Sequence, residues 1–364
     1  MPLKIGMDVR MIQHSGIGVR IQNILKSIRF SNDFEIFLFG DPQILSKYQL
    51  PKKSKIIPYN AKIYSIAEWF GHPSMKEMDY LDIPHFNVPL RFVSKCIVTI
   101  HDLIPWVMKE YHGSFIKRLY LRIVLSSISL YAKKIITVSE YSKSDFIKYF
   151  GLPMNSIETI YNGINKKLYV TQTSKSILEF KKKYNLPKQY FLTVGIGKGH
   201  KNFDFLLQNL LELWKSHSLE LSLVLAGAYE FKVELLNNLP EKYKVKVHAL
   251  PRIEDNEMPI MYQSAEALLY PSLYEGFGFP VVEAQSVNCP VISSNASVLP
   301  EILEDSALFF DPRSNTDFQT KVLDFCNMPE SKKKKLIQSG KTNSNRFSWE
   351  ISVSSIQKFY LSLL

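Results

Sequence analysis

Two glutamates eight positions apart stand in the segment Pro271–Glu283, which reads PSLYEGFGFPVVE. Glu275 begins a loop that contains two glycines, and Pro280 suits the first turn of a helix that would carry Glu283. The first carboxylate can accept hydrogen bonds from sugar hydroxyls, free loop amides can donate to phosphate or sugar oxygens, and the second carboxylate suits a ribose diol. This order of residues predicts a site for a sugar linked to a nucleotide.

Each glutamate also has a simpler explanation. Glu275 could be an acid on a surface loop, and Glu283 a favourable charge in the first turn of a helix. The two could also form the acid and nucleophile of a glycosidase, which needs carboxyl groups about 5–9.5 Å apart. Spacing in the sequence does not give that distance. A glycosidase would also have no use for the loops elsewhere in the chain that are typical of nucleotide binding.

A basic loop with glycines follows the first strand that we expect in the second half of the chain. Gly195–Asn202 reads GIGKGHKN and places Lys198 and Lys201 before a helix. A lysine there can bind a diphosphate as a point charge, helped by the positive potential of the helix N-terminus. An exposed basic loop without a ligand explains the same residues equally well.

The first half of the chain carries two further candidate segments. Gly16 and Gly18, in a loop after the first expected strand, would let backbone amides approach a phosphate. A tight turn that requires positive φ also explains them. His101 and Asp102 directly follow a buried type of strand, where α/β folds place their ligands. The histidine can donate to a phosphate or a sugar hydroxyl, but Asp102 could equally cap the following turn.

Strand-like runs alternate with helical ones along both halves, which predicts an α/β fold with two parallel sheets. The strands expected in the first half are Leu3–Val9, Glu35–Phe39, Lys55–Ile57, Ile83–His85, Cys96–Ile100, Lys134–Val138 and Ile157–Ile160. Those in the second half are Phe191–Gly195, Leu221–Ala226, Val245–Ala249, Ala267–Tyr270 and Pro290–Ser293. The main helices are expected up to about Ile28 and over Ser114–Lys133, Ser142–Tyr149 and Phe203–His217.

The length of 364 residues suggests two domains, and a polar, lysine-rich stretch near residues 165–188 marks their junction. We expect one Rossmann-like, doubly wound domain over residues 1–168, a second over 169–346, and a last amphipathic helix over 347–364. Ligands of such domains lie at the carboxyl ends of the strands, here in a cleft that the two domains would face.

The formal charge of +11 favours anionic partners, such as nucleotides, phosphates, acidic membranes or nucleic acid. Nucleic acid is not expected, because no helix-turn-helix, zinc or aromatic-sheet signature is recognisable. The three cysteines are widely spaced and odd in number, which argues against a disulfide framework and a zinc knuckle and fits a reducing cytoplasm. The N-terminal MPLKIGMDVR does not resemble a signal peptide.

The chain resembles the retaining glycosyltransferases of the GT-B fold whose hallmark is two glutamates eight positions apart, the mannosyltransferase-like group 1 transferases of glycosyltransferase family 4. The resemblance runs nearly from end to end. It rests on SGIGVR, TIHDLIP (Thr99–Pro105), ITVSEYSKSDFIKYFG (Ile136–Gly151), IYNGIN (Ile160–Asn165), GHKN, LVLAG (Leu223–Gly227), YPSLYEGFGFPVVEA, SVLPE (Ser297–Glu301) and the terminal FSWE. It implies an acceptor-side first domain, a nucleotide-sugar-binding second domain, and a last helix that crosses back to the first domain.

By position, the resemblance also implies roles for single residues. The donor-binding residues would be Gly16, Gly18, Lys198, Lys201, Phe277, Gly278, Phe279 and Glu283, and the catalytic residues His101, Asp102 and Glu275. Many members place an arginine in the loop after the first strand of the second domain. Here Ile196 follows Gly195, so Lys198 or His200 would have to replace that phosphate clamp.

The implied reaction is transfer of a hexose with retention of anomeric configuration. Neither a metal nor a cofactor is expected, because loop amides, helix N-termini and Lys201 would stabilise the leaving diphosphate. SGIGVR and TIHDLIP are similar to the motifs of members that use GDP-mannose, although users of UDP- and dTDP-sugars share them. A glycan or polyprenyl-linked glycan would be the acceptor, in the synthesis of a cell-surface polysaccharide such as lipopolysaccharide. A non-catalytic nucleotide-sugar-binding protein is the alternative of another class.

The segment Lys109–Lys148 carries eight basic residues against three acidic ones. It also holds apolar residues of an exposed type, Phe115, Tyr120 and Leu121. Such a surface could rest on anionic lipid, and a helix that faces the core with a solvated basic edge explains it equally well. We therefore expect a cytoplasmic protein and leave open its peripheral contact with the inner face of the membrane.

Overall fold

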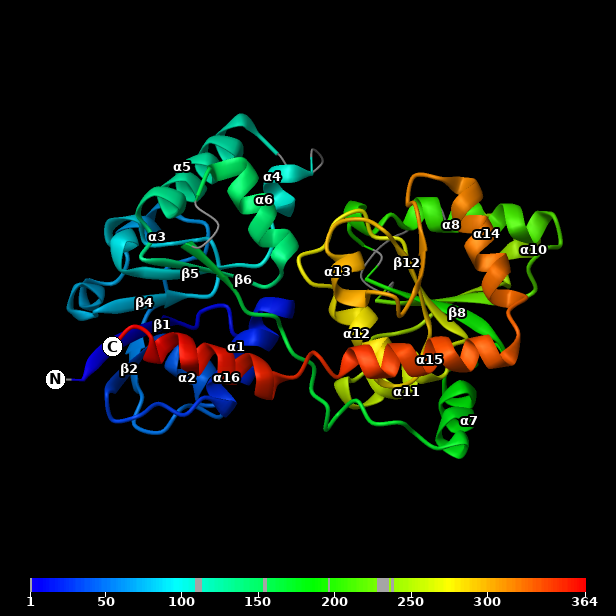
Figure 1. The fold of residues 1–364 in the computed structure, drawn as a ribbon, viewed down its shortest axis with the longest axis horizontal. Helices are drawn as coiled ribbons and strands as arrows, with labels where there is room; N and C mark the ends of the chain where they lie inside the picture. The colour runs from blue at the N-terminus through cyan, green and yellow to red at the C-terminus, as the bar shows by residue number, and fades with distance from the viewer. Residues whose placement is uncertain (1, 109–112, 153–155, 196, 228–235, 237–238) are drawn as a thin grey trace. The chain divides into compact units, whose positions relative to one another are not determined.

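The computed structural model describes residues 2–108, 113–152, 156–195, 197–227, 236 and 239–364 (Figure 1). The chain divides into two compact units. Unit 1 consists of Met1–Gly163 with Phe347–Leu364, and unit 2 consists of Ile164–Arg346. The junction expected from the sequence lies a few residues beyond the end of unit 1 at Gly163. No helix in the described ranges has the length and apolar content that a bilayer span requires.

Unit 1 contains a seven-stranded sheet with the order β3-β2-β1-β4-β5-β6-β7, in which paired strands are parallel. The strands are β1 (Leu3–Asp8), β2 (Phe34–Gly40), β3 (Lys55–Pro58), β4 (Tyr80–Ile83), β5 (Cys96–Ile100), β6 (Lys134–Thr137) and β7 (Ile157–Thr159). The bounds predicted for β4, Ile83–His85, were wrong, because this strand ends at Ile83 and is followed by Pro84. A proline cannot donate to a ladder, so it favours the end of a strand there.

The helices of unit 1 are α1 (Ser15–Ser27), α2 (Pro42–Leu45), α3 (Ile66–Phe70), α4 (Ile104–Val107), α5 (Phe115–Tyr131), α6 (Glu140–Phe150) and α16 (Trp349–Leu361). The side chains of Ser114 and Ser139 cap α5 and α6 by accepting hydrogen bonds from backbone amides of the first turn. Gly151 ends α6 with a φ of 70°, a conformation that favours glycine.

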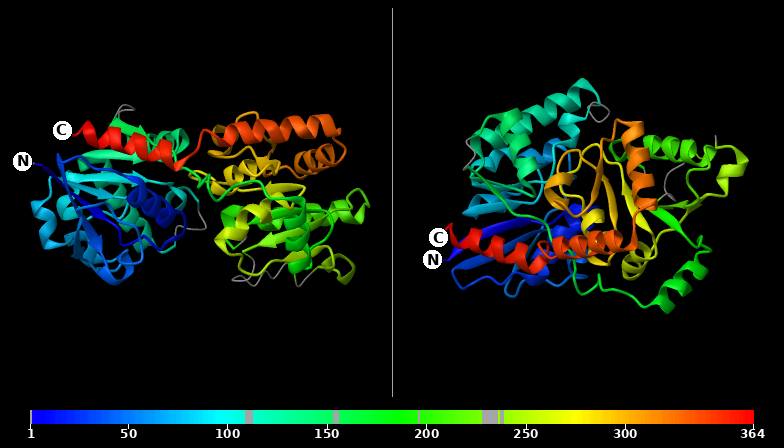
Figure 2. Two further views of the ribbon diagram at one scale, coloured as in Figure 1. Left: turned by 90° about the horizontal axis from the view of Figure 1, so that it is seen from below. Right: turned by 45° about the vertical axis from the view of Figure 1, so that its right-hand side comes forward.

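The last helix, α16, packs against α1, although the two are far apart in the sequence (Figures 1 and 2). The Tyr360 hydroxyl donates to the half-buried Asp82 carboxylate on β4. Gly163 allows the chain to pass close to the start of α16, since a Cβ there would lie 2.2 Å from the backbone carbonyl carbon of Ser348. The terminal helix is therefore an integral part of unit 1.

Unit 2 contains a six-stranded sheet with the order β10-β9-β8-β11-β12-β13, again with parallel pairs. Its strands are β8 (Tyr190–Val194), β9 (Ser222–Ala226), β10 (Val247–Ala249), β11 (Ala267–Tyr270), β12 (Val291–Ser294) and β13 (Leu308–Phe310), and the sequence did not predict the last of these. Its helices are α7 (Ser174–Lys183), α8 (Phe203–Lys215), α10 (Glu241–Lys244), α11 (Met258–Gln263), α12 (Phe279–Ser286), α13 (Leu299–Leu303), α14 (Asn315–Cys326) and α15 (Glu330–Ser344). The expected α/β class with two doubly wound parallel sheets is confirmed.

The two sheets share a feature that locates ligand sites. In unit 2 the strand order changes direction between β8 and β11, and in unit 1 between β1 and β4. Loops that leave the carboxyl ends of such neighbouring strands turn to opposite faces of the sheet and leave a crevice between them. In unit 2 these loops are the basic segment after β8 and the glutamate segment after β11.

Candidate active site

The loops that follow β8 and β11 are tied together through the backbone of His200. Its carbonyl oxygen accepts a hydrogen bond from the Leu273 amide at 2.7 Å and lies 3.1 Å from the Ser272 hydroxyl oxygen. His200 belongs to the 3-10 helix Gly199–Lys201, which precedes α8. The pairing of β8 with β11 therefore brings together two loops that are about seventy residues apart in the sequence.

A buried ion pair between Lys201 and Glu275 forms the centre of the site. Lys201 Nζ lies 2.6 Å from Glu275 Oε1, and the two side chains are 17% and 10% exposed. The same carboxylate oxygen accepts hydrogen bonds from the Tyr270 hydroxyl at 2.8 Å and the Ser272 hydroxyl at 2.6 Å. Lys201 also donates to the Tyr270 hydroxyl at 2.8 Å. The site thus holds one cation and one anion, joined through a tyrosine.

Electrostatics fix the charge states of this cluster. Burial acts to raise the pKa of Glu275, but Lys201 and the hydrogen bonds to the carboxylate hold that pKa below its ordinary value. Burial lowers the pKa of His200 to about 4 against the attraction of Glu275. Burial and Glu275 raise the pKa of Tyr270. At neutral pH the site therefore contains a carboxylate, a neutral imidazole and a protonated phenol.

The backbone around Glu275 is fixed by serines and one glycine. The Glu275 amide donates to the Ser297 hydroxyl at 3.0 Å, and the Ser294 hydroxyl donates to the Ser272 carbonyl. Gly278 precedes α12 with a φ of 89°, and a Cβ there would also lie 3.2 Å from a side-chain carbon of Leu299. A residue with a side chain would be strained at this position, which explains the second glycine of the motif.

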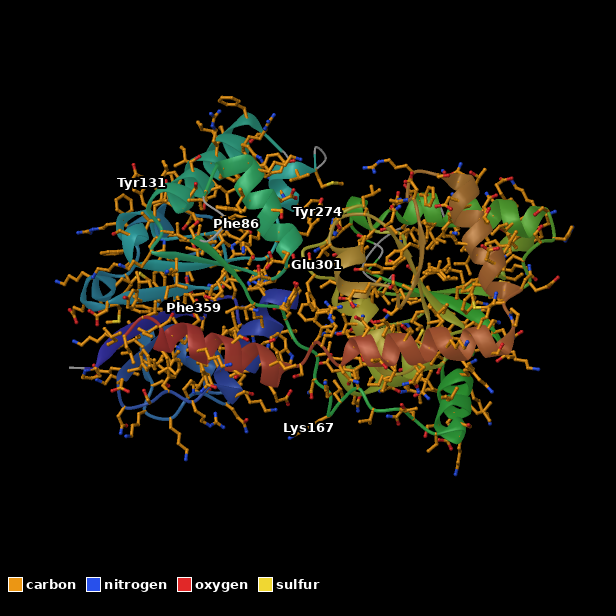
Figure 3. All side chains as sticks on the ribbon, viewed as in Figure 1. Phe86, Tyr131, Lys167, Tyr274, Glu301 and Phe359 are labelled. Carbon is orange, nitrogen blue, oxygen red and sulfur yellow. The ribbon has the colours of Figure 1, made fainter. Side chains whose placement is uncertain are left out.

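The predicted donor-binding residues Phe277 and Phe279 flank that glycine, and their ring centroids lie 5.1 Å apart. Phe277 is 4% exposed, so its side chain packs in the protein and only its backbone could serve a ligand. Tyr274 in the same loop and Glu301 on α13 are labelled in Figure 3.

Glu283 lies in the second turn of α12, and its carboxylate is held by two tyrosines. The Tyr262 hydroxyl donates to Glu283 Oε2 at 2.9 Å, and the Tyr169 hydroxyl is hydrogen-bonded to the same carboxylate. Burial raises the pKa of Glu283, while both hydroxyls act to lower it. No described contact joins Glu283 to the Lys201–Glu275 cluster. The charge of Glu283 nevertheless contributes to the raised pKa of Tyr270.

The two residues considered for the missing phosphate clamp differ in accessibility. Lys198 is exposed just before the 3-10 helix, whereas the His200 side chain is 4% exposed. A neutral buried imidazole is a poor substitute for an arginine, so Lys198 is the better candidate of the two. Ile196, which stands near the place of that arginine, lies outside the described residues.

The sequence suggested that Gly16 and Gly18 lie in a loop before the first helix, and the structure contradicts this. Both lie in the first turn of α1, which begins at Ser15. A Cβ at Gly18 would lie 2.5 Å from the carbonyl oxygen of Ile12, so this glycine is required by the close approach of the preceding loop. The N-terminus of α1 still lies beyond the carboxyl end of β1, and its free backbone amides would favour an anion there.

His101 and Asp102 follow β5 as expected, and each has a described partner in unit 1. His101 Nε2 lies 2.9 Å from the Pro84 carbonyl oxygen. Burial and the nearby Arg20 lower the pKa of His101 to about 3, so the imidazole is neutral and donates its Nε2 hydrogen to Pro84. Asp102 Oδ1 accepts a hydrogen bond from the Ile104 amide at 2.9 Å, so it does cap the turn that leads into α4.

Several residues of these two regions were missed by sequence reasoning. Tyr270, Ser272 and Ser297 lie within the motifs that carried the resemblance, but nothing in a motif tells which of its side chains point inward. Tyr169 and Tyr262 lie outside those motifs. In unit 1, Arg10 forms ion pairs of 2.5 Å with Asp8 and 2.6 Å with Glu68 at the carboxyl end of β1. Glu68 is 58 residues from Arg10, so only the fold pairs them.

Relatives in sequence connect these features to known proteins. A family model of glycosyl transferases group 1 matches residues 174–343, and one of glycosyltransferase family 4 matches residues 82–168. The O-antigen chain mannosyltransferase RfbU of Salmonella typhimurium is 31% identical over 248 residues, which cover 68% of this chain and just under two thirds, 65%, of RfbU. The O-antigen chain mannosyltransferase B of Escherichia coli is 30% identical over 75% of this chain and 72% of the relative.

Solved structures show the same fold. HepE of Anabaena, in complex with UDP and glucose, matches over all of both chains with a TM-score of 0.76 and 18% identity. WaaG, a glycosyltransferase involved in lipopolysaccharide biosynthesis, matches over 96% of this chain and 98% of its own with a TM-score of 0.72 and 14% identity. These likenesses show the GT-B fold. The sequence matches confirm the family resemblance, and the chain belongs to the group 1 glycosyl transferases of glycosyltransferase family 4.

Proposed function

We propose that this glycosyltransferase transfers a hexose, mannose from GDP-mannose, to a glycan or polyprenyl-linked glycan acceptor with retention of anomeric configuration. The product would belong to a cell-surface polysaccharide. The observation that carries the proposal is the buried Lys201–Glu275 pair at the β8–β11 crevice. The choice of mannose is supported by the similarity to two O-antigen mannosyltransferases.

The pair supplies both groups that a sugar diphosphate requires. A diphosphate oxygen that reaches Lys201 would replace Glu275 as the partner of the ammonium, and Glu275 would then accept hydrogen bonds from hydroxyls of the transferred sugar. Lys201, assisted by backbone amides of the loop at Gly278, would stabilise the charge that develops on the leaving diphosphate. Chemistry of this kind depends on fixed dipoles and charges, so we propose that it needs no metal.

In the proposed step, the bond between the anomeric carbon and the donor phosphate oxygen breaks, and the acceptor oxygen attacks on the same face of the sugar. The acceptor proton passes to the departing phosphate, so atoms and charges balance. His101 and Asp102 are proposed to serve the acceptor and the transferred sugar. His101 would do so as a neutral imidazole whose Nδ1 remains an acceptor, because Nε2 donates to Pro84.

A UDP-sugar donor is the second candidate, because HepE shares the fold and was solved with UDP and with UDP-glucose. A dTDP-sugar would use the same arrangement. The test is to incubate the purified chain with GDP-mannose, UDP-glucose and a dTDP-hexose, each with and without excess EDTA, and to follow release of the nucleoside diphosphate. Release from GDP-mannose in EDTA supports the proposal. Release from another donor alone would replace mannose, and activity that EDTA abolishes and Mg²⁺ or Mn²⁺ restores would contradict metal independence.

We also propose that the protein is cytoplasmic and that α5 places unit 1 on an anionic membrane surface. Large apolar side chains of α5 are exposed, including Phe115 at 80%, Ile116 at 75% and Tyr131, labelled in Figure 3, at 61%. Lys117, Arg118 and Arg122 are exposed on the same helix. Apolar insertion combined with basic charge favours an anionic bilayer. The expected role of Leu121 was wrong, because it is 7% exposed and packs in the core, and Tyr120 is half-buried against Trp69.

A further inference from the structure

Two tyrosines from separate segments converge on Glu283. Tyr262, on α11, is fully buried and donates to Oε2 at 2.9 Å. Tyr169 is 8% exposed and bonds to the same carboxylate from the segment that begins unit 2. The two ring centroids lie 6.4 Å apart. Glu283 is thus fixed by two hydroxyls that belong to no recognised motif.

The segment that carries Tyr169 is itself anchored to α11. The Gln172 amide donates to the Gln263 side chain at 2.6 Å, and Gln263 Nε2 donates back to the Gln172 carbonyl at 3.1 Å. Gln263 directly follows Tyr262 in the chain. These reciprocal bonds therefore join the segment that carries Tyr169 to the helix that carries Tyr262.

Two donors on one carboxylate have a chemical consequence. A glutamate side chain is free to rotate about its last bonds, and a carboxylate that must receive two hydroxyls of a ribose has to present its oxygens in one orientation. Burial and the charge of Glu283 raise the pKa values of both tyrosines, so their hydroxyls stay protonated and act as donors. Both hydroxyls favour the ionised, accepting form of Glu283, against the burial that raises its pKa.

We propose that Tyr169 and Tyr262 are positioning residues that orient Glu283 toward the ribose diol of a nucleoside diphosphate. They would thereby determine donor affinity and the preference for ribose over deoxyribose, and not the rate of sugar transfer. This inference rests on the proposed function, in which Glu283 binds the nucleotide ribose. The ligand would be a ribonucleoside diphosphate with both ribose hydroxyls present.

The test compares Tyr169→Phe, Tyr262→Phe and the wild-type chain by calorimetric titration with GDP, UDP and their 2′-deoxy forms. A hydrogen bond to a charged group is worth about 1.5–3 kcal/mol, so the wild type should prefer the ribose form by roughly tenfold or more. Each variant should bind the ribonucleotide about threefold to tenfold more weakly, and its preference for ribose should fall toward unity. Donor hydrolysis should show a raised KM with kcat within about twofold of wild type.

Tyr184→Phe is the matched control, because Tyr184 donates to Glu257 at 2.7 Å elsewhere in unit 2. It should keep the wild-type preference for ribose. Glu283→Gln distinguishes the ribose-binding role of Glu283 from the positioning role of the two tyrosines. If Glu283→Gln loses the preference while both tyrosine variants keep it, the positioning role is wrong and the donor function stands. If Glu283→Gln keeps it too, the ribose role of Glu283 is wrong and the inference falls with it.

Discussion

The ammonium of Lys201 lies 2.6 Å from a carboxylate oxygen of Glu275, so the groups proposed to hold the donor phosphate and the donor sugar satisfy each other. The pair is buried and is bridged by the Tyr270 hydroxyl, which bonds to both members. We propose that a donor phosphate competes with this internal anion for Lys201. Glu275 would then oppose the binding of a free nucleoside diphosphate and assist only when a sugar is attached.

Replacing Glu275 by Gln should therefore have opposite effects on binding and on turnover. Without the internal carboxylate, Lys201 becomes available, and free GDP or UDP should bind several-fold more tightly. Donor turnover should fall by about a hundredfold or more, because an interaction with the reacting sugar is lost. Titration and donor hydrolysis measure the two effects.

Glu257→Gln is the matched control, since it removes a 2.7 Å ion pair with Lys183 elsewhere in unit 2. It should leave both quantities unchanged. Near-normal turnover in Glu275→Gln would contradict the assigned role of this residue, and weaker nucleotide binding would contradict the competition.

Replacing Lys201 by Met should lower stability as well as activity. It leaves a buried carboxylate without its cation, and breaking a buried pair from one side typically costs about 3–5 kcal/mol. The hydroxyls of Tyr270 and Ser272 would still satisfy Glu275 in part, which moderates the loss. Chemical denaturation measures the free energy of unfolding.

The double variant Lys201→Met with Glu275→Gln distinguishes the structural from the functional effect. It should regain most of the stability, because no unpaired charge remains, and none of the activity. A double variant as unstable as Lys201→Met alone would show that the pair is not the cause.

Much of this arrangement follows from the sequence, because local signals agree with the fold. Cys96–Ile100 is uncharged and β-branched, and it forms β5 with the predicted bounds. The glycines and proline after β11 predict a loop that opens a helix, and α12 begins there. The contact between Lys201 and Glu275 was not predicted, because it depends on the pairing of β8 with β11.

What the sequence did not show depends on contacts between distant residues. Tyr169 and Glu283 are separated by more than a hundred positions, and Arg10 and Glu68 by 58, so no local pattern links them. The position of Gly18 inside α1 was missed for a local reason, because two glycines suggested a loop and the close approach of the Ile12 carbonyl is not visible in the sequence. The exposure of Phe115 and the burial of Leu121 are set by what α5 packs against.

Two histidines of unit 1, the buried His85 and the half-buried His101, should make the stability of the protein sensitive to acid. Burial lowers the pKa values of His101 and His85 to about 3, against an ordinary value of 6.5. Between those values the unfolded chain binds protons that the folded chain does not, so stability is full above pH 6.5 and falls as the pH decreases toward 3. His101→Gln should reduce the slope of unfolding free energy against pH in this range. An unchanged slope would contradict the lowered pKa and the neutral state of His101.

The surface of α5 provides the last prediction. Phe115 and Ile116 are the most exposed large apolar residues of that helix, and Lys117 and Arg118 follow them. Replacing Ile116 by Glu removes apolar area and adds a charge that anionic lipid repels, so binding to vesicles with phosphatidylglycerol should fall by about tenfold or more. Flotation of the full chain with anionic and with neutral vesicles measures the effect.

Leu178 on α7 offers a matched control, because it is 68% exposed in unit 2, on a helix whose last turn is also basic. Leu178→Glu should float with anionic vesicles as the wild type does, since only α5 is proposed to meet the membrane. Equal flotation of the wild type with both kinds of vesicle would remove the membrane from the proposed function. Equal losses in the two variants would instead indicate a general effect of charge, because a specific surface on α5 predicts that only the first variant is released.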